Sequence, residues 1–437
     1  MRDLALAALV FGSIPFILKK PFWGLLVWVW LSIMNPHRLA YGFAYSMPFA
    51  QIIAIVLLSS LLVHAKKLYA FQANGITLCL IGFVLWVCVS PWFSFHPSGE
   101  FDLWLRVIKI QLMVLITFFL VGNKDELQKL VWILALSVGF FGIKGGLFTI
   151  ASGGSYRVWG PEGTFIGDNN TLALAVIMVV PLFRYLQMHS ENRWVRRACV
   201  AAMFLCTVSA VGSYSRGALL ALLAMVSFIW LKSRTKAITG ILIVAALPVV
   251  FNLMPESWMG RMNTIGTYDT DGSALGRINA WWTAWNIALN RFPIGAGFDM
   301  YTPEVFGRYA PNPLAIHAAH SIYFQVLGEH GFVGLGLFLA VFGFAWVAGR
   351  WVVNNTRGQP SLDWAHDMAA MLQVSLIGYA VGGAFLSLSY YDFPYYVAAM
   401  LAILRILVKN ELASAATLPI VLKSKVDIAR VAKVGAK

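Results

Sequence analysis

The sequence predicts an all-α polytopic membrane protein of about 12 transmembrane helices, with a large and partly helical periplasmic loop. Composition is the first reason. Of 437 residues, 59% are hydrophobic and only 12% are charged, and the mean hydropathy is +0.72. A typical soluble domain carries about 25% charged residues. The second reason is that the apolar residues form long unbroken runs, and 17 Trp, 30 Phe and 15 Tyr suit two aromatic belts at the lipid headgroups.

The individual spans follow from the length of each apolar run, because a helix needs about 20 apolar residues to cross the hydrocarbon layer. Residues 3–34 hold two short apolar pieces split by Lys19-Lys20-Pro21, so they form either a hairpin of short spans or one broken helix. The other candidate spans are residues 48–64, 74–93, 106–121, 128–151, 165–183, 198–214, 217–231, 237–254, 322–349, 366–388 and 395–408. The count is therefore about 12 or 13.

Basic residues predict the orientation, because short cytoplasmic loops are rich in Lys and Arg. Such loops occur at every second connection: Lys66-Lys67, Lys124/Lys129, Arg193/Arg196/Arg197, Lys232/Arg234/Lys236, Arg350/Arg357 and the tail from Lys423 to Lys437. The loops between them, including 152–164 and 255–321, are then periplasmic, and the chain lies in a bacterial inner membrane. The N-terminus is cytoplasmic only if residues 3–34 cross the membrane once.

This alternation divides the chain into four parts. Residues 1–254 form an N-terminal transmembrane bundle, 255–321 a periplasmic loop domain, 322–408 the C-terminal transmembrane helices and 409–437 a cytoplasmic tail. Within the loop domain, Arg277, Trp281 and Trp285 are four residues apart and share one face if residues 274–290 are helical. A Trp-rich helix of this kind is expected to lie in the membrane interface.

Several function classes are disfavoured. The net charge of +14 does not indicate nucleic-acid binding, because most Lys residues flank apolar spans. The four Cys lie inside apolar runs without the spacing of metal ligands or of a disulfide framework. Asp269 and Asp271 lie in a Gly/Ser-rich turn and are expected to cap their own backbone. No internal repeat of the transporter kind is present.

Arginines on the predicted periplasmic side are the first candidates for chemistry. The 255–321 loop contains Arg261, Arg277, Arg291 and Arg308 and no Lys, and Arg157 lies in another periplasmic loop. Arg presents a planar fork that grips phosphate oxygens in pairs, so the set suggests a diphosphate-bearing lipid. Pairing with nearby Asp and Glu, or snorkelling of the side chain, is the alternative for any single Arg.

Arg216 and His320 have the strongest local contexts. Arg216 follows Ser215, which is a plausible N-cap of the next helix, so free backbone N–H groups and the guanidinium converge on one anion site. His320 precedes the span that begins near Ile322 and can accept a proton from a sugar hydroxyl. His317 lies nearby, but no third ligand is placed for zinc, and no metal site is predicted.

Two other features carry less weight. The loop 35–47 contains no acidic residue, unlike the first periplasmic loop of many polyprenyl-dependent glycosyltransferases, and His37 and Arg38 are expected only to anchor the interface. Lys109 and Lys144 are possible charges inside the membrane, but they are not placed symmetrically.

With these motifs the sequence resembles the O-antigen ligase and polymerase superfamily, which includes bacterial protein O-oligosaccharyltransferases. The family pattern of His-Ser/Asn, nine residues and Gly-x-x-Gly matches His320-Ser321, Gly331 and Gly334, and Arg-x-x-x-Leu matches Arg216 and Leu220. Further matches are residues 276–282, residues 292–297, and Arg157 with residues 163–165 and Asn169. Residues 1–38 also resemble the N-terminal region of the O-glycosylation ligase subfamily.

The resemblance implies a bundle of about twelve spans with both termini cytoplasmic. It implies transfer of a glycan from undecaprenyl diphosphate to a sugar of lipid A–core, without a cofactor. Arg216 and Arg277 would bind the diphosphate, with Arg157 and Asn169 as looser donor-binding matches, and His320 would be catalytic. Ser215, Trp281, Arg291 and His317 are supporting candidates.

The alternatives stay open. A repeat-unit polymerase or a protein O-oligosaccharyltransferase would use the same donor and the same residues. A transporter or flippase of polyprenyl-linked glycans belongs to another class, and it predicts broken helices in matched halves.

Overall fold

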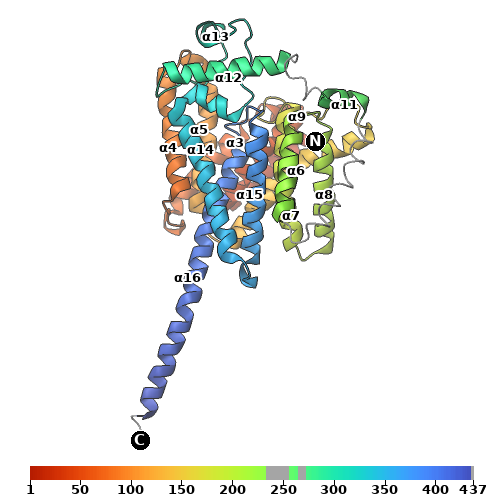
Figure 1. Cartoon of the computed structure of the whole chain (residues 1–437). Helices are drawn as coiled ribbons and strands as arrows, with labels where there is room; N and C mark the ends of the chain where they lie inside the picture. The colour runs from red at the N-terminus through yellow and green to blue at the C-terminus, as the bar shows by residue number, and fades with distance from the viewer. Residues whose placement is uncertain (233–254, 264–271, 435–437) are drawn as a thin grey trace.

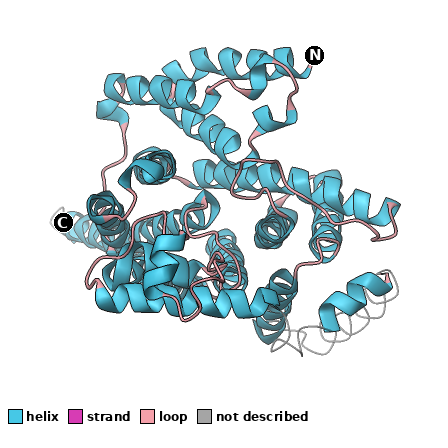
Figure 2. Ribbon diagram, turned by 90° about the horizontal axis from the view of Figure 1, so that it is seen from above, coloured by secondary structure: helices cyan, strands magenta, loops and turns pink. Residues whose placement is uncertain are grey.

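The computed structural model describes residues 1–232, 255–263 and 272–434, and every regular element in these ranges is a helix (Figures 1 and 2). The candidate span 237–254 and the Asp269–Asp271 turn lie outside the described residues. Six described helices are long and apolar enough to cross a membrane. They are α4 (Gly75–Val89, extended by the turn η4, Ser90–Phe93), α5 (Pro97–Leu120), α6 (Lys124–Ala151), α7 (Asn169–His189), α8 (Arg193–Val211) and α14 (Ile322–Thr356).

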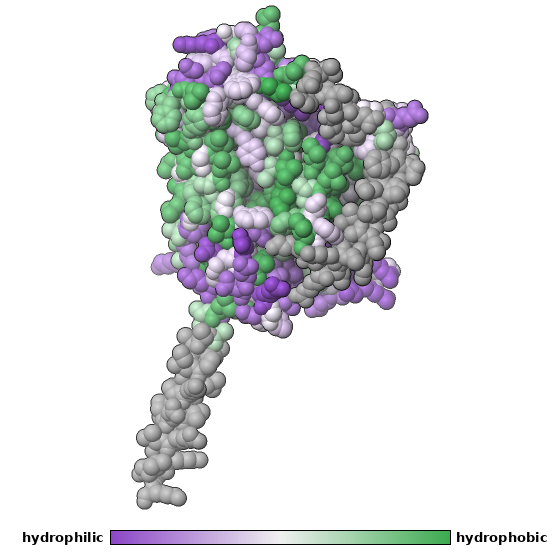
Figure 3. Space-filling view, viewed as in Figure 1, coloured by the Kyte–Doolittle hydropathy of each residue, from purple (hydrophilic) through white to green (hydrophobic). Residues whose placement is uncertain are grey.

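Further helices complete the bundle. The apolar ones are α2 (Pro21–Met34), α3 (Phe49–Val63) and α9 (Arg216–Lys232), and α15 (Asp363–Gly383) and α16 (Asp392–Val434) occupy the last two candidate spans. Figure 3 shows a hydrophobic band between two hydrophilic ends, and Figure 1 shows α16 continuing out of the bundle. The protein is therefore a multi-pass, all-helical membrane protein over its described residues.

Asn and Asp caps explain where several of these helices begin. The side chains of Asn74, Asn123, Asp168 and Asn192 each accept a hydrogen bond from a backbone N–H in the first turn of α4, α6, α7 and α8. Such caps satisfy N–H groups that have no partner within the helix.

The first 34 residues form a hairpin. Helix α1 (Arg2–Lys19) ends at Lys20, which is extended because Pro21 follows it. The Asp3 carboxylate accepts hydrogen bonds from the Gly42 and Ala44 amides, at 3.0 and 3.1 Å. The start of α1 therefore lies beside the loop that follows α2. The cytoplasmic location of both termini that the family resemblance implies stays a prediction.

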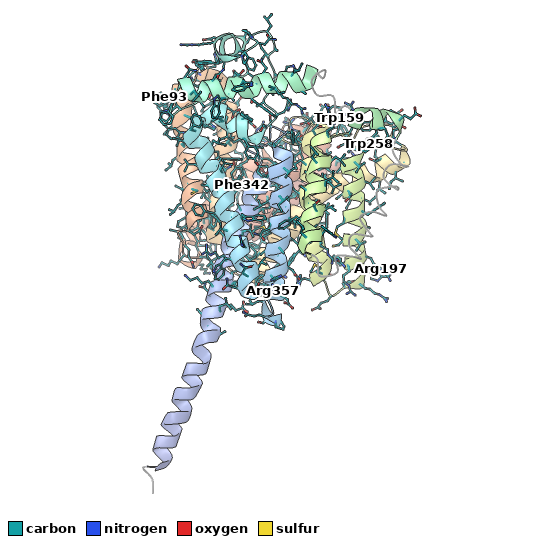
Figure 4. All side chains as sticks on the ribbon, viewed as in Figure 1. Phe93, Trp159, Arg197, Trp258, Phe342 and Arg357 are labelled. Atoms are coloured by element: carbon teal, nitrogen blue, oxygen red, sulfur yellow. The ribbon has the colours of Figure 1, made fainter. Side chains whose placement is uncertain are left out.

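The two ends of the bundle differ in what covers them. Helix α12 (Gly272–Asn290) lies across one end, here called the α12 end, with α11 (Glu256–Asn263) and α13 (Pro303–Tyr309) nearby (Figure 1). Trp159 and Trp258 lie at this end, whereas Arg197 and Arg357 lie at the opposite end (Figure 4). Arg197 and Arg357, which belong to two of the loops predicted to be cytoplasmic, thus lie at the same end of the bundle, opposite α12.

Helix α14 is broken at Gly331, which has a φ of 67° and non-helical geometry. The break frees backbone carbonyls, and the segment 292–297 satisfies two of them. The amides of Ala296 and Gly297 donate to the carbonyls of Gly328 and Glu329, at 2.8 and 3.0 Å. A Cβ on Gly331 would lie 2.4 Å from the Pro293 carbonyl oxygen. The family-like glycines of both segments therefore serve close backbone packing.

Candidate functional site

The start of α7 is hydrogen-bonded to the turn between α8 and α9. Asp168 caps α7 by accepting from the amides of Asn170 and Thr171, at 2.8 and 3.1 Å. The next residue, Asn169, is buried and donates from its side-chain amide to the Ser213 carbonyl at 2.7 Å. This bond brings the end of the 152–168 loop to the segment that leads into Arg216.

Ser215 caps α9, as the sequence predicts. Its hydroxyl accepts a hydrogen bond from the Ala218 amide at 3.2 Å, and Arg216 is the first residue of the helix. Tyr214 has a φ of 61°, and its hydroxyl donates to the Gly154 carbonyl at 2.7 Å. Arg157 lies over the Tyr214 ring, with 5.6 Å from its guanidinium carbon to the ring centre. The 152–168 loop therefore adds a second arginine next to the α9 N-terminus.

Helix α12 holds the loop that carries the histidines. The Trp281 ring stacks on Phe324 of α14 at 5.0 Å, and its indole N–H donates to the Ala319 carbonyl at 2.6 Å. Asn279 donates to the carbonyls of Asn312 and Ala315, both at 2.9 Å. The loop before α14 is thereby tied to α12 at both of its ends.

His320 lies at the junction of this loop with α14. It is half-buried, and its φ of 44° lies in the left-handed region that non-glycine residues rarely adopt. Burial lowers its pKa below the usual 6.5, and the positive charges of Arg277 and His317 lower it further. The negative charge of the Asp168 carboxylate raises the pKa of His320. His320 is therefore within electrostatic reach of both α12 and the start of α7, and its imidazole is neutral at pH 7.

The start of α9, which carries Arg216, and the start of α14 both pack against the end of α15. A Cβ on Gly217 would lie 3.2 Å from the Phe385 side chain, so the start of α9 packs against the end of α15. A Cβ on Gly383 would lie 2.6 Å from Ile322, so the end of α15 also packs against the start of α14. Helix α9 and His320 thus meet at one end of the bundle, which is the α12 end. Arg216, Arg277 and His320 are sequence candidates that lie at this end.

Comparison with known families assigns this region. Residues 201–339 match the family model described as O-Antigen ligase. The chain carries an O-antigen ligase domain. The family is one of glycosyltransferases, so the protein is an enzyme of this class. Residues 1–191 match a model described as Family of unknown function (DUF5935), and no curated protein matches the chain.

The O-antigen ligase domain contains the three candidates Arg216, Arg277 and His320, and we call this candidate set the ligase site. The other sequence candidates lie at different distances from it. Asn169 and Arg157 approach from the preceding region, through the contacts to Ser213 and Tyr214. His317 packs against α12, because a Cβ on Gly276 would lie 2.3 Å from its ring. His317 also lines a cavity of about 310 Å³ beside α12, together with Asn279 and Trp282. Among the described residues, no three His, Cys, Asp or Glu side chains are grouped as a metal site requires.

Arg291 lies toward the opposite end of α12 from Arg277. It directly follows the last residue of α12. Arg277 lies 14 residues earlier in the chain, which is about 21 Å along the helix axis at about 1.5 Å per residue. Its guanidinium donates to the Phe93 carbonyl and lies 4.0 Å from the centre of the Phe95 ring. Burial lowers its pKa from the usual 12.5. Arg291 therefore anchors the segment before α5, and its supporting role at the site stays a prediction.

Sequence reasoning missed Asp168 and Tyr214. Asp168 is the only described acidic residue whose charge is found to raise the pKa of His320. The run Asp168-Asn-Asn-Thr171 is a helix-start pattern that could have identified it. Tyr214 lies in the quoted Ser213–Gly217 motif, but nothing in that motif indicates that its ring faces Arg157.

Proposed function

We propose that the O-antigen ligase domain transfers a glycan from undecaprenyl diphosphate to a sugar hydroxyl of lipid A–core. The observation that carries this proposal is that α12, which contains Arg277, holds the loop that ends at His320, through the hydrogen bond from Trp281 to the Ala319 carbonyl. The transfer needs an anion site for the leaving diphosphate and a base for the attacking hydroxyl. Arg277 and His320 supply one of each.

The proposed step is a single displacement. The acceptor hydroxyl oxygen attacks the anomeric carbon, the bond from that carbon to the diphosphate oxygen breaks, and its electron pair leaves with undecaprenyl diphosphate. The imidazole of His320 takes the proton of the hydroxyl. Because the oxygen attacks from the side opposite the leaving group, the anomeric configuration inverts.

The leaving diphosphate is stabilised by fixed positive groups in this mechanism. Arg216 and Arg277 offer guanidinium forks, and the N-terminus of α9 adds backbone N–H groups beside Arg216. Preorganised donors directed at developing charge are usually the largest catalytic contribution. The two arginines supply the countercharge themselves, so the step is proposed to be metal-independent.

The α12 end is proposed to face the periplasm. Arg197 and Arg357 lie at the opposite end (Figure 4), where the excess of basic residues indicates the cytoplasm. The inner membrane of a bacterium would then present the lipid-linked donor and lipid A–core on one side. Labelling of cysteines introduced at Trp159 and at Arg197 with a membrane-impermeant reagent tests this orientation. Only the first should react in intact spheroplasts.

Purified protein tests the reaction directly. Detergent-solubilised protein with undecaprenyl-diphosphate-linked glycan and lipid A–core should form glycosylated lipid A–core. A flippase forms no glycosidic bond, so the absence of product with active control lipids would contradict the proposal. A deletion strain then separates the related enzymes. Loss of polymer from lipopolysaccharide with long lipid-linked chains retained indicates a ligase, whereas capping with a single repeat unit indicates a polymerase.

A further inference from the structure

A second cation-rich cavity lies in the N-terminal region, outside the O-antigen ligase domain. It has a volume of about 420 Å³. Its walls are the end of α2 with the turn η1 (Pro36–Leu39), the start of α3, one face of α5 and residues 163–165. We call this the basic cavity. All of its walls fall within residues 1–191, to which the family comparison assigns no function.

The charge of the basic cavity is positive. Arg38, Arg106 and Lys109 line it together with a single carboxylate, Asp102. Asp102, Arg106 and Lys109 are spaced i, i+4 and i+7, so they share one face of α5. In the part of the chain that the structure describes, none of these four groups takes part in a salt bridge. Three cations thus face the cavity with their charge uncompensated by an ion pair.

Lys109 is the most informative of the three because of its depth. It lies 10 residues from Gly99 in the candidate span Gly99–Leu120, which is about 15 Å along the helix. Ionisable residues at such depth are costly and usually face a functional cavity. Lys109 follows Arg106 by three residues, so the two side chains are neighbours on one face of α5, and both line the cavity.

The cavity also has groups suited to the rest of a lipid headgroup. Trp28, Leu31 and Phe49 give it apolar walls, and Ser32, Asn35 and Gln51 add hydrogen-bonding groups. Asn35 has a φ of 50°, and its side-chain amide donates to the Ser32 carbonyl at 2.6 Å. The combination of cations, neutral polar groups and aromatic walls fits a phosphorylated sugar on an apolar anchor.

One loop connects the basic cavity to the ligase site. Phe165 lies under Arg106, with 5.6 Å from the guanidinium carbon to the ring centre, and a Cβ on Gly163 would lie 3.5 Å from the Arg38 guanidinium. The same loop ends at Asp168, whose charge raises the pKa of His320, and at Asn169, which donates to the Ser213 carbonyl three residues before Arg216. Asn169 is the fifth residue after Thr164, so their Cα atoms lie within about 18 Å of each other. Two headgroups could occupy the two sites at once.

We propose that the basic cavity binds a phosphate of the acceptor glycolipid, with Arg38, Arg106 and Lys109 as its ligands. This inference rests on the proposed glycan transfer, which requires two anionic amphiphiles side by side. The diphosphate of the donor already has Arg216 and Arg277. The acceptor needs its own anchor, and phosphates on lipid A–core supply the matching charge.

The kinetics of Lys109→Gln test this proposal in the full-length protein, reconstituted in phosphatidylcholine vesicles with donor and phosphorylated lipid A–core. Loss of one charge-assisted contact should raise the acceptor KM about 10-fold or more, with kcat within about two-fold. Lys109→Arg should restore most of the affinity, and Arg106→Gln should repeat the effect. Lys144→Gln is the matched control, because Lys144 is an exposed cation in the candidate span Lys124–Ala151 and does not line the cavity. Equal KM values for Lys109→Gln and Lys144→Gln, or a fall in kcat alone, would overturn the inference.

Direct binding separates this inference from the proposed reaction. Purified protein without donor should retain phosphorylated lipid A in native mass spectrometry, and Lys109→Gln should lose it. Enzymatic removal of the phosphates should weaken binding to the wild type but not to the variant. If the wild type binds lipid A yet transfers nothing, the proposed reaction fails while the cavity assignment stands. If phosphatidylglycerol displaces lipid A at equal concentration, the cavity holds a bulk phospholipid and the acceptor assignment fails.

Discussion

The ligase site and the basic cavity place similar groups in two regions of one protein. Each combines arginines with a histidine whose pKa is lowered by burial and by a neighbouring arginine, His320 beside Arg277 and His37 beside Arg38. Each also contains a non-glycine residue with positive φ, His320 and Asn35. The ligase site differs in its setting, because a capped helix N-terminus and the Asp168 carboxylate converge on it.

This difference shows that a group of cations with an imidazole does not by itself identify a catalytic site. A cluster of positive charge attracts an anion in either region. Only the ligase site places a strained imidazole within reach of both arginine charge and a carboxylate. The comparison therefore predicts that losses in the ligase site lower kcat, whereas losses in the basic cavity raise the acceptor KM.

His320→Ala should have the largest effect. Removal of a general base typically costs about 10²–10⁴-fold in rate, so transfer should fall by that factor. Initial rates with purified protein measure it. His64→Ala is the matched control, because His64 is the C-cap of α3 and its ring is hydrogen-bonded to the Ser60 carbonyl, at 3.0 Å. Wild-type rates from His320→Ala would remove the imidazole from the mechanism and erase the distinction between the two regions.

Arg277→Gln should have the next largest effect. Removing one preorganised donor from a developing anion costs about 10²–10³-fold in kcat, and the donor KM should change less. Arg277→Lys keeps the charge without the fork and should recover part of the loss. Arg308→Gln is the control on neighbouring α13, where Arg308 lies over the Tyr309 ring. An unchanged kcat with a raised donor KM would make Arg277 a binding residue, like those of the basic cavity.

These residues show what the sequence could predict about the site. Ser215 was identifiable as an N-cap because serine before an apolar run has a local meaning, and the structure confirms the cap. The approach of α12 to His320 depends on Trp281 reaching Phe324 and Ala319, contacts that no periodicity encodes. The basic cavity was missed because Arg38 and Lys109 are far apart in the chain, and each alone resembles a membrane anchor.

The fold shows the same division between local and distant information. The apolar runs predicted most of the helices, because the length of an apolar run can be counted directly in consecutive residues. The hairpin of residues 3–34 stayed open between two alternatives, since only the contact of Asp3 with Gly42 and Ala44 decides it. The glycines of residues 292–297 and 331 looked like part of a catalytic pattern, whereas their geometry is that of backbone packing.

Gly331→Ala should therefore damage the scaffold of the ligase site and not its chemistry. With a φ of 67° and a ψ of −169°, Gly331 lies in a region that is essentially restricted to glycine and costs another residue about 1–3 kcal/mol, and the new methyl group would meet the Pro293 carbonyl. Thermal unfolding in detergent should show a loss of about 2 kcal/mol or more. Gly336→Ala, in the same helix with open space around it, should be neutral or slightly stabilising. Equal melting temperatures for the two variants would contradict the role assigned to the break in α14.

The pH dependence should show the smallest effect and the most specific one. His320 acts as a base only when neutral, so kcat/KM should fall at low pH, with a midpoint below the usual 6.5 because burial and Arg277 lower its pKa. Arg277→Gln removes a positive charge, which makes protonation easier and moves this midpoint to higher pH. Asp168→Asn keeps the cap of α7 but removes a negative charge, so the midpoint should move to lower pH. Opposite shifts of the midpoint in the two variants would assign the titration to His320. The pKa of His37 in the basic cavity is lowered by burial and by Arg38, so neither substitution should change it. A midpoint that stays fixed in both variants would show that another group controls the rate at low pH.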